Sequence, residues 1–264
     1  MGLFGRLFPG SKQVDPVIGA WVLLSGPAPE LSEVVRHLRG RGKTVAEDEG
    51  RIVVAGPSEK DEPTRVSMTR LDPMPAPLLD ELVRSAWWWS DAGSCRGHER
   101  VVALQAAEGT GDRLLRRRAV SEVAAAVARL SPTVGVVWTD AAGLYEPEEF
   151  CEHVEASSGD HPPTPFWVSL RLLTTSRGQL LVSTGLEAFG SRELEIEASG
   201  ASALVDPQQL AAVLHGLIRV MLVKGGVLSV GDKIPLSETV RLHVVEVGAS
   251  SIPGRRDAFH LSLA

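Results

Sequence analysis

The stretch Gly185-Leu-Glu-Ala-Phe-Gly-Ser-Arg-Glu-Leu-Glu-Ile-Glu197 joins a glycine-punctuated turn to a strand pattern. Glycines at both ends of such a turn supply a positive φ or a close backbone approach, here on either side of Phe189. From residue 193 onward, charged and apolar residues alternate with the two-residue period of a β-strand. This alternation predicts that Leu194 and Ile196 face a core. It also predicts that Glu193, Glu195 and Glu197 line the opposite, exposed face.

Three carboxylates on one strand face repel one another unless water, a cation or a basic partner lies against them. A partner-facing acidic strip and an ordinary solvated face are both open interpretations. A divalent cation is a weaker one, because residues two apart on a strand are about 7 Å apart and one ion would need ligands from elsewhere. A phosphate site is disfavoured, since the glycines precede a strand and not a helix.

Hydrophobic periodicity on both sides of this stretch predicts a series of alternating elements. The first series has the order β-α-β-β-α-β, and the second repeats it with one extra strand and a terminal hairpin. We therefore predict an α+β protein with two ferredoxin-like (βαββαβ) modules in tandem, antiparallel sheets and helices packed on one face. The first series is 17–24, 30–38, 51–55, 64–71, 75–89 and 98–106. The second is 134–138, 147–154, 166–173, 179–183, 193–197, 208–223, 227–230, 240–247 and 258–263.

The predicted domain organisation follows from this order. Residues 1–13 form an N-terminal lead-in, 14–110 the first ferredoxin-like module, 111–131 a connecting helix, and 132–264 the second module. The hairpin between 166–173 and 179–183 would turn at Ser176-Arg-Gly178. Duplication of a module is a hypothesis from element order alone, because the two series share no residue-level repeat.

Composition limits the classes of function. Acidic residues outnumber basic ones in the second half of the chain, which argues against nucleic acid as a partner. The basic cluster of Arg113 and 116–118 falls in a helical pattern and is more typical of a solvated face than of a phosphate site. No apolar run is long enough to span a membrane. Two cysteines give no disulfide framework, so a cytoplasmic location is expected.

The tripeptide Trp87-Trp88-Trp89 is the most unusual local feature. Consecutive helical residues are about 100° apart, so in a helix the three indoles could not share one core face. We predict that at least one of them packs against the second half of the chain or against another chain. An external interface is the competing interpretation, because tryptophan is enriched at interface hot spots.

Metal and nucleophile chemistry have little support. Cys95-x-x-His98 and Cys151-x-His153 together offer four zinc ligands, but the second spacing is short and falls in a predicted helix. Neither thiol follows a sharp turn or has an identifiable orienting acid. No phosphate-binding loop, dinucleotide fingerprint or nucleophile elbow is present. We therefore expect no metal and no cofactor.

Two blocks of the second half resemble a bacterial family, domain of unknown function 4261. The first block is Val136-Val-Trp-Thr-Asp140 followed by Pro147-Glu-Glu-Phe150, and the second is Phe166-Trp167 with residues 184–196. The resemblance covers roughly the last 160 residues and its Gly-Leu-x-x-Phe-Gly-x-x-Glu-Leu-Glu motif is moderately specific. It implies no activity. The resemblance assigns no roles to the motif positions, which are Gly185, Phe189, Gly190, Glu193 and Glu195.

Taken together, the sequence favours a non-enzymatic cytoplasmic protein-interaction module, of adaptor or immunity type. Its expected binding residues are Glu193, Glu195, Glu197, Trp87, Trp88 and Trp89, its partner is a protein, and homo-oligomerisation stays open. The alternative is a carboxylate-based hydrolase with a site near residues 185–197. A convergent pocket holding Glu193, Asp140 and a basic residue would favour the enzyme, whereas a shallow acidic strip would favour the binder.

Overall fold

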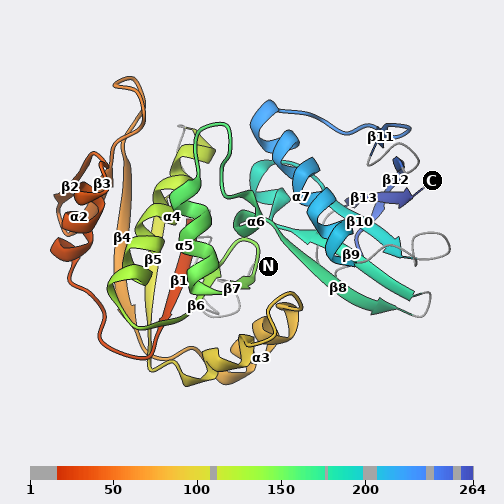
Figure 1. Cartoon of the computed structure of the whole chain (residues 1–264). Coiled ribbons are helices and arrows are strands. Elements are labelled where there is room, and N and C mark those ends of the chain that lie inside the picture. Colours follow the sequence, from red (N-terminus) through yellow and green to blue (C-terminus); the bar gives the residue numbers. More distant parts are fainter. Residues whose placement is uncertain are drawn as a thin grey trace. The chain divides into compact units, whose positions relative to one another are not determined.

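The chain divides into two compact units, unit 1 (Met1–Phe166) and unit 2 (Trp167–Ala264) (Figure 1). The computed structural model describes residues 17–107, 112–175, 178–198, 207–235, 241–251 and 257–263. The predicted lead-in, 1–13, and two residues of the predicted turn at 176–178 lie outside these ranges. Within them, no helix is long and apolar enough to cross a membrane.

Unit 1 is built on a seven-stranded sheet, sheet A, in which every neighbouring pair is antiparallel. The predicted apolar strand at 17–24 is confirmed as β1, near the middle of the sheet, where it pairs with β5 and β6. The spatial order is β2-β3-β4-β5-β1-β6-β7. The strands are β1 (Val17–Leu24), β2 (Val45–Asp48), β3 (Arg51–Val54), β4 (Thr64–Leu71), β5 (Arg100–Ala107), β6 (Thr133–Trp138) and β7 (Gly143–Tyr145).

Both faces of sheet A are covered. Helix α4 (Arg113–Leu130) lies along β1, β4, β5 and β6, with α2 (Leu31–Gly40) and α5 (Pro147–Ala156) beside it (Figure 1). On the other face Trp21 and Leu23 of β1 join a core with Leu79 and Leu82 of α3 (Ala76–Ser85), next to the short helix η1 (Ala92–Gly97). Alternate residues of β1 are thus buried on opposite sides, which explains its continuous apolar sequence. The predicted one-sided helix layer is wrong for this unit.

Helix α4 is a central packing element and not the predicted connector. Asp112 caps its first turn by accepting a hydrogen bond from the Leu114 N–H at 2.7 Å. Nearly every position from 116 to 127 is buried. The basic cluster is therefore only in part a solvated face: Arg113 is exposed, but Arg116 is buried, and Arg117 is fully buried with an ion pair of 3.1 Å to Asp140.

Unit 2 carries a six-stranded sheet, sheet B, in the order β11-β12-β13-β10-β9-β8. Its pairs are antiparallel except β10 with β13, which is parallel. The predicted pairing of 166–173 with 179–183 is confirmed by the β8–β9 pair. No strand forms at the predicted 227–230. The strands are β8 (Ser169–Thr175), β9 (Gly178–Thr184), β10 (Glu193–Ala198), β11 (Lys233–Pro235), β12 (Arg241–Ala249) and β13 (Asp257–Leu263).

Three helical segments accompany the strands at the start of unit 2 and within it. They are α6 (Thr164–Trp167), which spans the division between the units, η2 (Leu186–Phe189) and α7 (Pro207–Lys224). The predicted apolar helix at 208–223 is confirmed by α7, which starts at the proline expected to introduce it. One stripe of α7 is buried, and it consists of Leu210, Leu214, Ile218 and Met221.

The protein is thus a mixed α/β chain with largely antiparallel sheets and helices, as expected at the coarse level. The tandem of ferredoxin-like modules is not confirmed. In a ferredoxin-like order the first strand lies between the third and fourth strands of its module, whereas sheet A places β5 between β4 and β1. Strand β6, predicted at 134–138 to begin the second module, completes the first sheet together with β7, which the sequence did not predict. The units divide after Phe166.

Candidate functional site

The glycine-punctuated turn has the backbone geometry that its sequence predicts. Gly185 and Gly190 have φ values of 123° and 81°, in the region that favours glycine, and they bracket η2. The ring of Phe189 lies 6.2 Å from that of Trp167, tilted by 31°. The turn therefore has a defined conformation and connects β9 to β10.

Glu193, at the start of β10, is buried with a 1% exposed fraction. Its Oε2 accepts a hydrogen bond from the Ser183 hydroxyl at 2.6 Å, and its Oε1 accepts from the backbone N–H groups of Gly185 at 2.8 Å and Glu187 at 3.2 Å. The Ser183 oxygen in turn accepts from the Leu194 N–H at 2.7 Å. The carboxylate thereby fastens the end of β9, the turn and β10 to one another.

Glu195 is equally buried, at 1%. Its Oε1 accepts hydrogen bonds from the Ser250 hydroxyl and the Ser251 N–H, both at 2.7 Å, and its Oε2 accepts from the Ser251 hydroxyl at 2.6 Å. His260 Nδ1 of β13 lies 3.8 Å from Oε2. The carboxylate thus fixes the segment that follows β12 against β10.

These two residues, here called the β10 carboxylates, correct the predicted exposed acidic face. Leu194 and Ile196 are buried as predicted, but so are Glu193 and Glu195, while Glu197 is half-buried. The physical reason is that β10 lies inside sheet B, between β9 and β13, and that hydroxyl and N–H donors satisfy the carboxylates. A buried carboxylate with a full set of internal donors stabilises the fold and offers no open face to a partner.

The three tryptophans follow α3 and do not extend it, because the helix ends at Ser85. The ring of Trp88 stacks on Tyr145 at 5.8 Å with an interplanar angle of 26°, and Trp87 meets Trp88 edge to face at 6.0 Å. All three indoles are half-buried. Since Tyr145 belongs to the predicted second half, the predicted packing of one tryptophan against that half is confirmed, although Tyr145 lies in unit 1.

The cysteines and histidines singled out in the sequence do not converge. The Cys95 thiol donates to the Val134 carbonyl at 2.8 Å, and burial raises its pKa to about 12. His98 accepts from the Met74 N–H at its Nε2, 2.8 Å away. On α5, burial raises the pKa of the Cys151 thiol to about 11. Within the described ranges no group of three or more His, Cys, Asp and Glu side chains could hold a metal ion.

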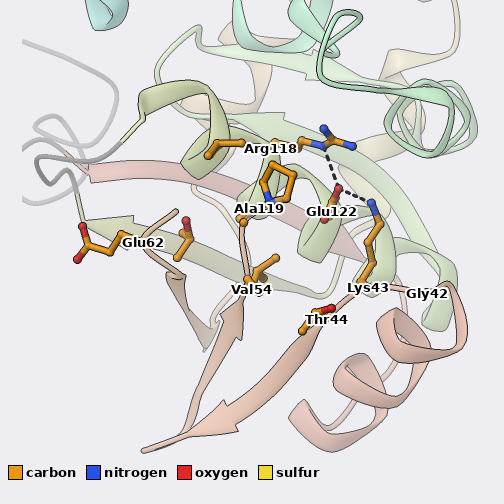
Figure 2. Close-up of a pocket in the computed structure, with 13 residues that line it drawn as sticks. Gly42, Lys43, Thr44, Val54, Glu62, Arg118, Ala119 and Glu122 are labelled. Atoms are coloured by element: carbon orange, nitrogen blue, oxygen red, sulfur yellow. Dashed lines mark hydrogen bonds and ion pairs between the residues drawn. The ribbon is translucent and has the colours of Figure 1, made fainter. Parts of the chain in front are cut away.

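A polar pocket that sequence analysis missed opens in unit 1 between α4 and the β2–β3–β4 end of sheet A (Figure 2). Its volume is about 250 Å³. The link from α2 to β2 forms one wall, the α4 surface a second, and the segment between β3 and β4 a third. Its polar lining consists of Lys43, Thr44, Glu62, Thr64, Arg118 and Glu122.

Glu122 joins two cationic side chains in the lining of this pocket. Lys43 Nζ lies 2.6 Å from its Oε1, and Arg118 Nε lies 3.1 Å from the same oxygen. The side chain of Glu122 is 8% exposed, whereas those of Lys43 and Arg118 are 35% and 23% exposed. Two cations on one carboxylate leave a net positive charge on this wall, and both cations keep contact with solvent.

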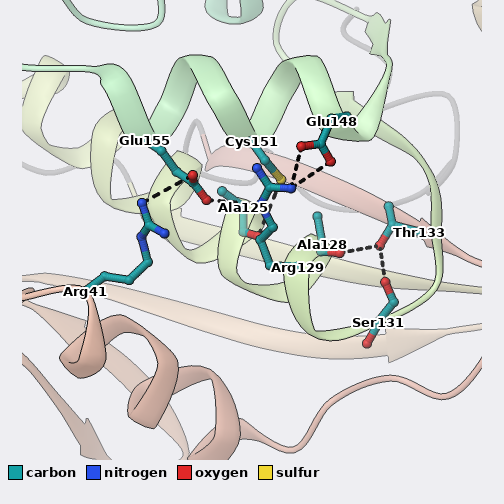
Figure 3. Close-up of polar contacts among 9 residues, drawn as sticks. All are labelled: Arg41, Ala125, Ala128, Arg129, Ser131, Thr133, Glu148, Cys151 and Glu155. Carbon is teal, nitrogen blue, oxygen red and sulfur yellow. Dashed lines mark hydrogen bonds and ion pairs between the residues drawn. The ribbon is translucent and has the colours of Figure 1, made fainter.

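A second pocket, of about 180 Å³, adjoins the first at Lys43 and Glu122 and continues between α2, α4 and α5. We call the two pockets together the α4 groove. Figure 3 shows the ion pairs near its α5 side, where Arg129 lies between Glu148 and Glu155. Arg129 Nη1 is 2.7 Å from Glu148 and its Nε is 3.1 Å from Glu155, which Arg41 also contacts at 3.2 Å. These carboxylates raise the pKa of the Arg129 guanidinium, with Glu148 the stronger cause.

Part of this groove had a sequence signal. Arg118 and Glu122 are four residues apart on a predicted helix, a spacing typical of an ion pair. Lys43 lies 79 residues from Glu122, and nothing in the sequence relates the two. Comparisons of the chain with models of protein families, with curated proteins and with solved structures gave no match.

Proposed function

We propose that this protein is a non-enzymatic protein-interaction module whose α4 groove receives a segment of a partner protein. The observation that carries the proposal is the Lys43–Glu122–Arg118 cluster, in which charged groups line an open pocket and remain within reach of a ligand. Charged groups arranged in this way give specificity and steer association. The half-buried segment 87–89 is a second candidate contact surface.

The hydrolase alternative near residues 185–197 has less support. A general acid or base must reach a substrate proton, or a water, within hydrogen-bonding distance. The oxygens of Glu193 and Glu195 already accept hydrogen bonds from internal donors, and both side chains are buried. Asp140, which such a site was expected to hold together with Glu193 and a basic residue, is paired with Arg117 of unit 1.

The biological setting stays part of the proposal. Cys95 and Cys151 are free and buried, which fits a reducing compartment such as the bacterial cytoplasm. The proposed relation to domain of unknown function 4261 rests on the two blocks 136–150 and 166–196, which include the motif around residues 185–195. In this proposal the motif maintains the fold of unit 2, and the groove of unit 1 binds the partner.

Selection of displayed random peptides on the immobilised full chain tests the proposal. Enriched peptides should lose at least about tenfold in affinity for the double variant Lys43→Glu/Arg118→Glu, because two attractive charges become repulsive. The matched control is Arg65→Glu/Arg100→Glu, which changes the net charge equally at exposed positions outside the groove. Equal thermal midpoints of the two variants would exclude unfolding. Peptides that bind both variants equally would contradict the proposal.

A further inference from the structure

We infer that the group recognised at Lys43 and Arg118 is a carboxylate of the partner, and that Glu122 occupies its place when the groove is empty. This inference rests on the proposed function, since it names the chemistry of the ligand at the same groove. Lys43 and Arg118 both contact Glu122 at the same oxygen, Oε1. An incoming carboxylate would find its two cationic partners already brought together and oriented by the internal one.

The donors of the pocket suit an oxyanion. A lysine ammonium carries three N–H donors, and Lys43 uses one of them on Glu122, so two can face a ligand. The guanidinium of Arg118 has five donors, of which only Nε contacts Glu122 and one Nη2 donor reaches the Ser157 carbonyl at 3.4 Å. Thr44 and Thr64 add two hydroxyls to the lining.

The charge balance favours a carboxylate over a phosphate. Lys43, Arg118 and Glu122 together carry one net positive charge, which a singly charged carboxylate neutralises. A phosphate group carries close to two negative charges at neutral pH and would meet Glu122 at close range. Glu62, on the other side of the pocket from the Lys43–Glu122 pair, repels either anion, and it repels the doubly charged phosphate more strongly (Figure 2). It would accept a cationic group located near the carboxylate of the partner segment.

Displacement of Glu122 is feasible because both of its cationic partners have part-exposed side chains. The side chains of Lys43 and Arg118 are 35% and 23% exposed, and part-exposed ion pairs contribute little to stability. Their ends can therefore move to a ligand without disrupting the core beneath α4. Glu122 then acts as an internal competitor that weakens binding of every carboxylate and admits only a segment with additional contacts in the groove.

The variant Glu122→Gln tests this inference, with NMR titrations of the full chain followed at the backbone amides of residues 42–44 and at Arg118 Nε–H. The additives are sodium acetate, inorganic phosphate and methylammonium chloride, at constant ionic strength. Removal of the competing charge should tighten acetate binding about tenfold, a change of about 1.4 kcal/mol. Glu148→Gln is the matched control, because Glu148 also accepts from a guanidinium, that of Arg129, but lines neither pocket and does not contact Lys43 or Arg118. Its acetate affinity should equal that of the wild type.

Three outcomes would overturn the inference. Methylammonium that binds the wild type and is lost in Glu122→Gln would show that the pocket recognises a cation through Glu122. If Glu122→Gln binds phosphate more tightly than acetate, the recognised group is a phosphate and not a carboxylate. If acetate shifts no NMR signal of the groove in either protein, the pocket does not bind a carboxylate. In that last case the peptide selection still decides independently whether the groove binds a partner.

Discussion

The β10 carboxylates of unit 2 and Glu122 of unit 1 are all at least nine-tenths buried, yet their surroundings differ in kind. Glu193 and Glu195 accept hydrogen bonds from hydroxyl and N–H groups of their own unit. Glu122 is held by two cations whose side chains reach solvent in a pocket. Burial alone therefore does not separate a structural carboxylate from a functional one, whereas the identity and exposure of its partners do.

Removal of the Glu193 side chain should have the largest effect on stability. Glu193→Ala leaves the Ser183 hydroxyl and the N–H groups of Gly185 and Glu187 without their acceptor, so unit 2 should lose about 4 kcal/mol of unfolding free energy. Urea unfolding, with hydrogen exchange at β10 to localise the loss, measures it. Glu197→Ala, at a half-buried position of the same strand, is the control and should cost less than about 1 kcal/mol. Equal losses would remove the distinction.

Unit 1 also contains a buried charge, the guanidinium of Arg117, which is paired with Asp140. Breaking this ion pair should cost slightly less unfolding free energy than Glu193→Ala. Asp140→Asn removes the carboxylate charge that lies 3.1 Å from the fully buried guanidinium of Arg117, which should lower the unfolding free energy by about 3 kcal/mol. Asp80→Asn breaks the exposed ion pair with Arg96 and should cost less than about 1 kcal/mol. Chemical denaturation of both variants gives the comparison. If Asp140→Asn loses as little free energy as Asp80→Asn, the prediction is wrong and the Asp140 carboxylate is not needed for stability.

Acidification should affect unit 2 through His215 of α7. Desolvation by burial lowers the pKa of this imidazole to about 4, below its unfolded value of about 6.5, so the unfolded chain binds more protons between these pH values. The contribution to stability is complete above pH 6.5 and declines as the pH falls towards 4, by about 3 kcal/mol. His215→Leu removes this dependence. Unfolding free energies of both proteins at pH 7 and pH 4 measure it, and identical slopes would contradict the shift.

The smallest effect on the unfolding free energy is expected at Glu122. Glu122→Gln should change the unfolding free energy by less than about 1 kcal/mol, because Lys43 and Arg118 remain hydrated when the charge is lost. Urea unfolding beside Glu148→Gln gives the measurement. A loss as large as that expected for Glu193→Ala would place Glu122 among the structural carboxylates and would contradict its displacement by a ligand.

The sequence predicted individual elements better than their arrangement. The run 17–24 and the helix at 208–223 were correct, because a continuous apolar run and a proline-introduced apolar helix are local patterns. Sheet order depends on long-range pairing, and so the position of β5 between β4 and β1, and the addition of β6 and β7 to sheet A, had no local signal. The same holds for Lys43 and Glu122, which only the folded sheet brings together.

Strand alternation misassigned the acidic face for a different reason. The pattern at 193–197 identified a strand correctly, but it assumes that charged residues face solvent. Strand β10 has neighbours on both edges, and Ser183, Ser250 and Ser251 provide hydroxyl donors to its carboxylates from distant parts of the sequence. No periodicity rule includes such donors, so the exposed and the buried alternatives have the same sequence pattern.

The parallel pair of β10 and β13 has a consequence for protein synthesis. Residues 257–263 form the strand that joins β10 to β12, so without them sheet B consists of two separate parts, β8–β9–β10 and β11–β12. Sheet A, by contrast, has its last strand at residue 145. On a chain made from the N-terminus onward, sheet A can form during translation, whereas β10 with its two carboxylates waits for the emergence of β13. During that interval one edge of β10 has no strand beside it.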